Sequence, residues 1–511
     1  MIDGLNRRLG ASAPAWFAFV GSLLLSWLAV GGSSVLNRDG MLYVDAALRF
    51  RAEGFAELIG TFDWPLLSML IAGLGGVIGM GFENAGHIID ASLLAGTCAL
   101  MVDLVRRHQP DDAAMAWATC VAVLAMPGYN GYRDQILREY GYWFFSMLAF
   151  WLALQWERRG CRWRDALPCQ LAVVGAMLFR LEAAVFLAAL IAWQVVSASA
   201  EGRIRRVFML AALPLLAMVS LAALVGAGLI DWPERVLRYL GAANPLGVHK
   251  WSEHAAHLLE SGVLPEYSRD EAVFILFFGM LSLIPIKFVK MLGLFVVPFA
   301  YSAFAGDRRP LVGRWALFGW AFLAHVVALM LFASDLLFLS GRHVSMLTLL
   351  AVPAVAAGLV FLWRRLPRWR PAVVVAAVAT MIANVVSLGP SREYLSAAGA
   401  WLAASEPDPV TVYVDDPRVA YYAGWGFASR KEQVVDRGQL EHLVAVGRFS
   451  TLVLSDSRRV QWVDAWLAGR GLQAARRFQN GSGEAVTIIR LPSVPAIQAP
   501  DLESLSWSRA E

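Results

Sequence analysis

Charged side chains stand where long apolar runs end in this sequence. The first such cluster includes Arg38, Asp39 and Gly40 and follows an apolar run at residues 15–36. Ionisable groups are costly within a membrane, so those at the ends of apolar runs are candidates for functional sites. A carboxylate at a membrane surface can accept a proton from a hydroxyl group or ligate a divalent cation. A solvated aspartate in a turn would show the same pattern, so both interpretations of Asp39 stay open.

A second cluster combines two arginines with two acids before an aromatic-rich apolar run. Its members are Arg133, Asp134, Arg138 and Glu139. Such a cluster suits a clamp for phosphate, and it also suits a carboxylate that neighbouring arginines keep ionised. A network of salt bridges at the membrane interface would have the same composition, and this alternative stays open.

Further charged side chains belong to the same class of candidates. Arg180 and Glu182 lie in a turn so tight that at least one of them must be close to the membrane. Lys287 and Lys290 lie at the end of the short apolar stretch 271–289, where they could place positive charge at a site. They could equally extend toward lipid headgroups, as long basic side chains often do.

Helices that cross a membrane would hold these charged clusters in position. Apolar residues make up 58% of the chain and charged residues 16%, which is far from the composition of a soluble domain. Apolar runs of about 20 residues, long enough to cross a bilayer, recur as far as residue 388. The first run is longer than the apolar core of a signal peptide, so we expect it to be a retained helix. The formal charge of +4 is small and scattered, which argues against nucleic acid as a partner.

The histidines and cysteines do not form a recognisable metal or disulfide pattern. His254 and His257 would share a helical face, but structural or acceptor-facing roles suit them better than metal binding. The four cysteines lie in apolar runs or in a short basic loop, with no zinc-site spacing. The sequence leaves open whether a divalent cation takes part in the chemistry.

The membrane topology can be predicted from six clusters of arginine, because basic residues are retained on the cytoplasmic side. An even number of crossings must separate each cluster from the next. About 11 crossings between residues 15 and 388, one of them at residues 291–305, satisfy this condition. The stretches 65–80 and 271–289 would violate it, and we expect them to be juxtamembrane or re-entrant helices on the outer face. The N-terminus is then cytoplasmic, and the chain after residue 389 is extracytoplasmic.

The composition of the chain changes near residue 391 to that of a small α/β domain. Strands are predicted at residues 411–414, 451–454 and 486–491, with helices at 439–446 and 460–468. Asp415, Asp416, Tyr421 and Tyr422 could bind a ligand at a strand end, but a capping turn is the better interpretation. The predicted domains are therefore residues 1–390 in the membrane and residues 391–511 outside it.

The order of these motifs resembles that of the GT-C glycosyltransferases, which include protein O-mannosyltransferases and lipid A aminoarabinose transferases. The resemblance covers nearly the whole chain and depends on the order and sidedness of motifs that are weak individually. They are Asp39-Gly40-x-x-Tyr43, Trp64-Pro65-Leu66-Leu67, Arg138-Glu139, Arg180-x-Glu182, Arg342-His343 and an outer C-terminal domain. The fold implied is an all-α polytopic membrane bundle with outer juxtamembrane helices and a small C-terminal α/β domain.

The resemblance also implies roles for particular residues. Asp39 would be a catalytic base or metal ligand, and Glu139 or Asp134 would be the second acid. Glu139 is favoured because the family's second acid usually stands at the start of the following helix. Arg138, Arg180, Arg342 and, outside the family's pattern, Lys287 would neutralise the phosphate of the donor.

Other positions depart from the family's pattern. Aminoarabinose transferases carry a lysine before the prolines of the juxtamembrane helix, where this chain has Asp63 and Trp64. Many relatives have an arginine near the start of the second crossing, where this chain has His87 and Asp90. Specificity for aminoarabinose is therefore not carried over.

The predicted function is transfer of a sugar from a polyprenyl-phosphate carrier, with inversion, to an envelope glycan, lipid or protein on the outer face of the inner membrane. A flippase or transporter for a lipid-linked glycan is the alternative. It predicts charged residues through both leaflets and repeated halves of the bundle. An assembly protein with an inactive site is a second alternative.

Overall fold

The computed structural model describes residues 10–198, 200–229, 231–232, 237, 241, 248–304, 315–386, 389–406 and 408–492. The chain forms two compact units. We name Met1–Gly32 with His87–Val386 the bundle unit, and Ser33–Gly86 with Ser387–Glu511 the sheet unit. The predicted boundary between a membrane domain and an outer domain at residue 390 stays a prediction.

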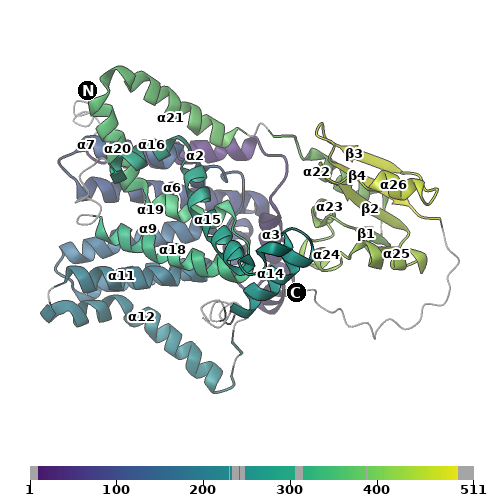
Figure 1. The fold of residues 1–511 in the computed structure, drawn as a ribbon, viewed down its shortest axis with the longest axis horizontal. Coiled ribbons are helices and arrows are strands. Elements are labelled where there is room, and N and C mark those ends of the chain that lie inside the picture. Colours follow the sequence, from purple (N-terminus) through teal and green to yellow (C-terminus); the bar gives the residue numbers. More distant parts are fainter. Residues whose placement is uncertain are drawn as a thin grey trace. The chain divides into compact units, whose positions relative to one another are not determined.

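The bundle unit consists of helices, most of them apolar around their whole circumference, as expected of helices buried in protein or lipid. Its helices α9 and α10 pack together, α12 packs on α10 and α11, and α11 packs on α18 (Figure 1). Helix α19 contacts α8, α15 and α18, and α16 contacts α20. The described helices are α2 (Ala13–Gly31), α6 (Phe82–His108), α7 (Ala113–Ala125), α8 (Pro127–Asn130), α9 (Glu139–Arg158), α10 (Trp163–Phe179), α11 (Ala184–Ser197), α12 (Ala200–Gly226), α14 (Val248–Glu260), α15 (Ala272–Leu292), α16 (Val296–Phe304), α18 (Ala316–Leu336), α19 (Gly341–Leu350), α20 (Val352–Arg365) and α21 (Arg370–Val385).

Several of these helices can cross a membrane. Among the described residues five helical segments are long and apolar enough, or six if the bent pair α19 and α20 forms one crossing. Other predicted crossings correspond to shorter apolar helices such as Ala113–Ala125 and Leu181–Ser197. The chain is therefore a multi-pass membrane protein, but the predicted number of about 11 crossings is not confirmed.

One predicted juxtamembrane stretch belongs to a longer helix. The stretch 271–289 lies in α15, which continues through Pro285. Together with the predicted crossing at 291–305 it belongs to one segment, Ala272–Ala303, that meets the length and composition of a span. Neighbouring groups can satisfy the backbone carbonyl that a proline leaves free in such a helix, so Pro285 is tolerated. By contrast, α5 (Leu66–Ile78) has the short length predicted for its stretch.

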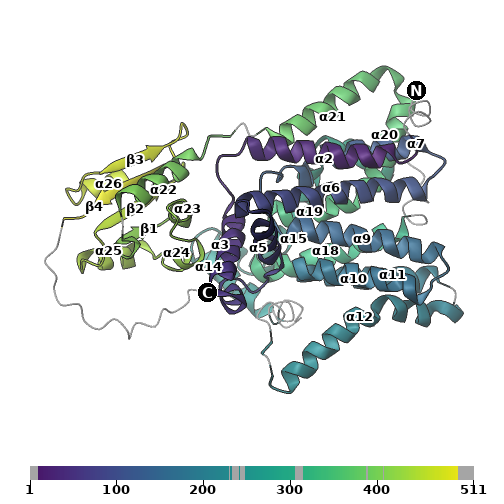
Figure 2. The same ribbon diagram turned by 180° about the vertical axis from the view of Figure 1, so that it is seen from behind.

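The sheet unit combines residues that are distant in the sequence. Its first part contains α3 (Arg38–Glu53), α4 (Phe55–Thr61) and α5. Its second part is a four-stranded sheet with the order β1-β2-β4-β3. Strand β1 (Val412–Val414) is parallel to β2 (Thr451–Asp456), while β4 (Ala485–Arg490) is antiparallel to β2 and to β3 (Arg476–Gln479). Helices α22 (Glu393–Ser405), α23 (Pro417–Tyr422), α24 (Ala428–Glu432), α25 (Arg437–Ala445) and α26 (Val463–Ala468) complete it (Figure 2).

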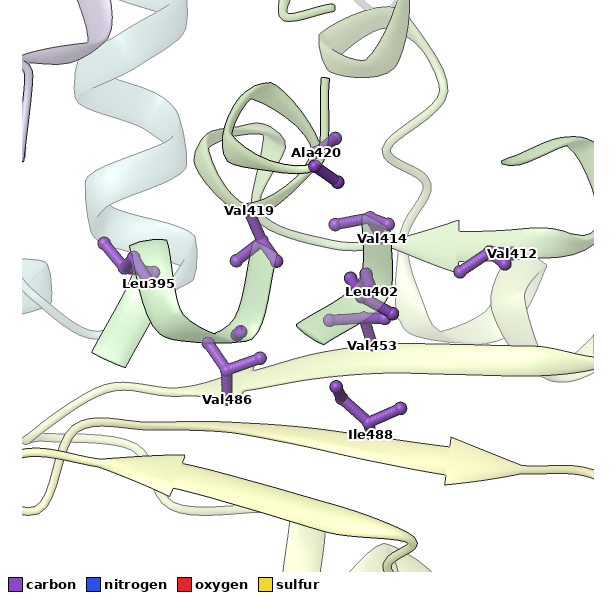
Figure 3. Packing of buried hydrophobic residues seen from close by; sticks show 11 residues of the cluster. Leu395, Leu402, Val412, Val414, Val419, Ala420, Val453, Val486 and Ile488 are labelled. Carbon is purple, nitrogen blue, oxygen red and sulfur yellow. The ribbon is translucent and has the colours of Figure 1, made fainter. Parts of the chain in front are cut away.

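Alternation along the strands gives this sheet two buried faces. Val412, Val414 and Val453 pack with Leu395 of α22 and Val419 of α23 on one face (Figure 3). Tyr413, Leu452 and Leu454 pack on the other face with residues of α25 and α26. The predicted strands and helices all appear, whereas the sequence missed β3, α22, α23 and α24 as separate elements. The residues of β3 are exposed or half-buried and include one apolar side chain, so this strand lacks the apolar alternation that predicts a strand.

Candidate active site

Two carboxylates and one guanidinium, linked by hydrogen bonds, lie where α9, α10 and α11 meet. Glu139 is the first residue of α9, Arg180 follows the last residue of α10, and Glu182 lies in the short 3-10 turn Leu181–Ala183 before α11. Arg180 Nη1 donates to Glu139 Oε1 over 2.7 Å, and its Nη2 donates to Glu182 Oε1 over 2.5 Å. We name Glu139, Arg180 and Glu182 the carboxylate triad.

Local backbone geometry places these side chains. Arg180 is extended, with φ −151° and ψ 124°, so the chain leaves α10 abruptly and turns back through Glu182 into α11. The exposed fractions of the three side chains are 7% for Glu139, 12% for Arg180 and 15% for Glu182. Charge-assisted hydrogen bonds are strongest where water is scarce, so the triad is rigid compared with a surface ion pair. Its formal charge is −1, because one guanidinium serves two carboxylates.

Asp90 of α6 fixes the backbone that leads into Glu139. Its Oδ2 accepts a hydrogen bond of 2.6 Å from the backbone N–H of Leu137, two residues before the triad. Asp90 is buried, and within the described residues its Oδ1 has no hydrogen-bond partner. The sequence identified Asp90 only as a departure from the family's pattern. Its long-range contact with Leu137 could not be read from spacing.

The side chains of Tyr142 and His325 lie next to the triad. Tyr142 lies one helical turn after Glu139, and its Oη is 3.5 Å from Nδ1 of His325 in α18. His325 Nε2 is 3.2 Å from the backbone carbonyl of His343 in α19. A carbonyl only accepts, so Nε2 carries the proton and Nδ1 accepts from the tyrosine hydroxyl. This chain of hydrogen bonds links α9, α18 and α19 beside the triad.

The other predicted residues fall at different places in the bundle unit. Arg138 precedes α9, and Asp134 lies in the loop before it; both side chains are half-buried. Arg342 is the second residue of α19, where His343 interacts electrostatically with Arg342, Arg180 and Glu182. The structure thus brings Arg342 to the neighbourhood of the triad.

Lys287 and Arg133 differ from this group. Lys287 is half-buried in α15, and among the described residues no hydrogen bond or ion pair joins it to the triad. Arg133 is buried and donates to the backbone carbonyl of Ser22, to the hydroxyls of Ser22 and Ser26, and to Asn130. Arg133 therefore links the loop before α9 to α2.

Asp39 belongs to the sheet unit. It lies in the first turn of α3 and is half-buried, where a carboxylate is favoured by the helix dipole. A Cβ atom at Gly40 would lie 2.6 Å from Oδ1 of Asn37 and 3.0 Å from side-chain atoms of Leu36, so a larger residue would require these side chains to move. The glycine beside Asp39 thus has a steric reason.

The predicted capping turn of the C-terminal part is confirmed at Asp416. Its carboxylate caps α23 through the backbone N–H of Arg418 and also binds the Arg418 side chain. That arginine holds the pKa of Asp416 below its ordinary value in spite of burial. Burial instead raises the pKa of Asp415 to about 7, although its carboxylate accepts hydrogen bonds from the backbone and hydroxyl of Ser455.

No group of three histidine, cysteine or acidic side chains suited to a metal ion occurs in the part of the chain that the structure describes. Glu139 and Glu182 are the acids of the triad that could contribute carboxylate oxygens to a cation, and both are bound by Arg180. His254 and His257 lie on α14 as predicted, while the side chain of His249 is outside the described residues.

No protein-family model matches the sequence, and no curated protein matches it. Solved structures are similar to it in fold. The crystal structure of ArnT from Cupriavidus metallidurans, bound to undecaprenyl phosphate, has a TM-score of 0.58 and 14% sequence identity. The match covers 94% of this chain and 98% of ArnT.

The oligosaccharyltransferase of Archaeoglobus fulgidus is also similar. Its structure tethered to an acceptor peptide gives a TM-score of 0.52 at 12% identity, covering 86% of this chain and 70% of that one. Its complex with zinc and sulfate gives 0.50 at 13% identity, with coverages of 85% and 67%. The resemblance to GT-C glycosyltransferases is therefore confirmed at the level of the fold.

Proposed function

We propose that this protein is a membrane glycosyltransferase that moves a sugar from a polyprenyl-phosphate carrier to an acceptor on the outer face of the inner membrane. The observation that carries the proposal is the carboxylate triad in a fold shared with membrane glycosyltransferases. ArnT was solved with undecaprenyl phosphate, and the archaeal oligosaccharyltransferase with an acceptor peptide. These support a lipid-linked donor and a polar acceptor of the same general kinds.

In the proposed reaction an acceptor hydroxyl or amine attacks the anomeric carbon of the donor sugar with inversion. The new bond forms as the bond between that carbon and the phosphate oxygen breaks, and the lipid phosphate leaves with the electron pair. A carboxylate takes the acceptor's proton. We assign this role to Asp39, with Glu139 as the second acid and Asp134 as its alternative.

Positive charge near the leaving phosphate stabilises the transition state. Arg138 and Arg342 are our candidates for this role, and Lys287 is a third from the sequence. Arg180 was also predicted to bind the phosphate, but both ends of its guanidinium fork contact acids. We therefore propose that Arg180 chiefly holds Glu139 in position, since a guanidinium fork matches carboxylates with fixed geometry.

The alternative function is a transporter or flippase for a lipid-linked glycan. Both functions need a bilayer-facing site for a polyprenyl carrier, so lipid binding alone does not distinguish them. Analysis of the products distinguishes them, because a flippase leaves the sugar attached to its carrier. The same measurement separates an inactive assembly protein from an enzyme.

The test has two steps. Mass spectrometry of lipid that co-purifies with the detergent-solubilised protein identifies the carrier and its sugar. Membranes containing the protein are then given a polyprenyl-phosphate sugar with an isotope label. We expect labelled product and free polyprenyl phosphate from wild type but from neither Asp39→Asn nor membranes without the protein. Undiminished transfer by Asp39→Asn would remove that residue from the mechanism, and no transfer to any offered acceptor together with intact flipping would favour the transporter.

A further inference from the structure

Within the sheet unit, α3 is fastened to the C-terminal part of the chain by a buried carboxylate. Asp45 lies in the middle of α3 with 4% of its surface exposed. Its Oδ2 accepts hydrogen bonds from the backbone N–H groups of Phe427, at 3.0 Å, and Ala428, at 2.9 Å. These amides open helix α24 and have no earlier helical carbonyl to bind, so Asp45 satisfies them across 382 and 383 residues of sequence.

The backbone around this contact is shaped to receive the carboxylate. Gly426 has φ +81°, a left-handed conformation that favours glycine, and a Cβ there would lie 3.3 Å from Oδ1 of Asp45. Arg49, one turn further along α3, approaches the same carboxylate with its Nε 3.7 Å from Oδ2. The buried charge is thus matched by two amides and one nearby cation, which is the condition for burying a carboxylate without a large penalty.

Two further contacts fasten the beginning of α3 to the neighbouring turn. The backbone N–H of Leu36 donates to Oη of Tyr422 over 2.8 Å. Nη2 of Arg38 lies 3.7 Å from Oδ2 of Asp416. The C-terminal partners in these contacts therefore come from one short segment, from the start of α23 to the start of α24.

Asp39 lies between these fastenings. Arg38 precedes it directly, and Asp45 follows it by six residues, about 9 Å along a helix. We propose that Asp45 is a positioning residue, through which the C-terminal α/β part of the chain sets the place of Asp39 in the reaction. This inference depends on the proposed role of Asp39. It gives the C-terminal domain a catalytic purpose that its own sequence does not indicate.

The test compares Asp45→Ala, Asp45→Asn and Glu53→Gln in the intact protein. Glu53 is the matched control, because it is an exposed acid at the end of the same helix. Transfer is measured on protein recovered as a single species by size-exclusion chromatography. We expect Asp45→Ala to lower kcat by about 10- to 100-fold with KM for the donor changed little, since small misplacements of a reacting group have effects of this size. Asp45→Asn should keep much of the wild-type kcat, because its amide oxygen still accepts a hydrogen bond from a backbone N–H.

Hydrogen exchange gives a second measurement that does not depend on activity. In Asp45→Ala the amides of Phe427 and Ala428 and those in the first turn of α3 should exchange faster, whereas Glu53→Gln should match wild type. Wild-type kcat in Asp45→Ala would overturn the inference, even if exchange at α24 increased. Unchanged exchange in the first turn of α3 would also overturn it. Failure of the proposed function is distinguishable, because wild type itself would then transfer no sugar.

Discussion

Arg180 donates to Glu139 across 41 residues of sequence, so the end of α10 holds the carboxylate that begins α9. The same guanidinium contacts Glu182 only two residues away. A short local pair and a long-range pair thus share one arginine. The arrangement makes the position of Glu139 depend on how α9 and α10 pack, and every substitution at Arg180 affects two carboxylates together.

The two acids before and at the start of α9 should differ in importance. Glu139→Gln is expected to lower transfer by about 10² to 10⁴, as is typical for loss of an acid–base group. Asp134→Asn should change it little, because Asp134 is a half-buried loop residue, whereas Glu139 is buried within the triad. The measurement is sugar transfer from polyprenyl phosphate in membranes, normalised to folded protein. If Asp134→Asn were inactive and Glu139→Gln active, Asp134 would be the second acid. If both variants were active, the loop would have no catalytic role.

Arg180→Ala should destabilise the bundle unit and abolish transfer. Removing one partner from a buried ion pair costs about 3 to 5 kcal/mol, because it leaves the other charge uncompensated. Arg159→Ala is the control, since Arg159 pairs with Asp165 near the opposite ends of α9 and α10 and is 63% exposed. Thermal unfolding in detergent should show a lower Tm for Arg180→Ala alone. Equal Tm values for the two variants would contradict a structural role for the triad.

Asp39→Asn should insert and fold as wild type does but lose transfer activity. Asn preserves the shape of the side chain at the first turn of α3, so only the charge and basicity are removed. The check is product formation by protein that keeps wild-type size-exclusion behaviour. Product at the wild-type rate would exclude Asp39 as the base.

The stability of the sheet unit should depend on pH through Asp415. Its pKa rises from 3.8 in the unfolded chain to about 7 in the folded one. Between these values the folded state binds more protons, so the free energy of unfolding falls as pH rises from about 4 to 7. The difference in Tm between Asp415→Asn and wild type should therefore increase over this range and level off above it. A difference that does not vary with pH would refute the assignment to Asp415.

The membrane topology yields a separate prediction. A reporter fused to the C-terminus should be extracytoplasmic, and one inserted in the basic loop containing Arg158 and Arg164 should be cytoplasmic, because six arginine clusters agree in parity. Residues 65–80 should not cross, in keeping with the 13-residue length of α5. A cytoplasmic C-terminus would require an odd number of additional crossings. The number of times that the apolar segment Ala272–Ala303 crosses the membrane would then be the first assignment to change.

The sequence alone determined the features that depend on local patterns. Apolar runs predict membrane helices because the bilayer imposes length and composition on each segment separately. Alternation in the last part of the chain predicts β1, β2 and β4, and the Asp416 cap follows from a side chain and backbone two residues apart. Glu139 could be expected at a helix start from the change of composition at that point. The family resemblance also rested on such local motifs, and their order along the chain was enough to predict the fold.

Only the tertiary structure decided which of these residues meet. The pairing of Arg180 with Glu139, the bond from Leu137 to Asp90 and the burial of Arg133 against α2 join positions that no local period relates. The continuation of α15 through Pro285 likewise depends on its surroundings, because a proline breaks a helix in water but can be accommodated in a bundle. Asp45 is the clearest case. As a residue in a polar helix it looks ordinary, and its role arises from the two backbone amides that the fold of a distant segment presents to it.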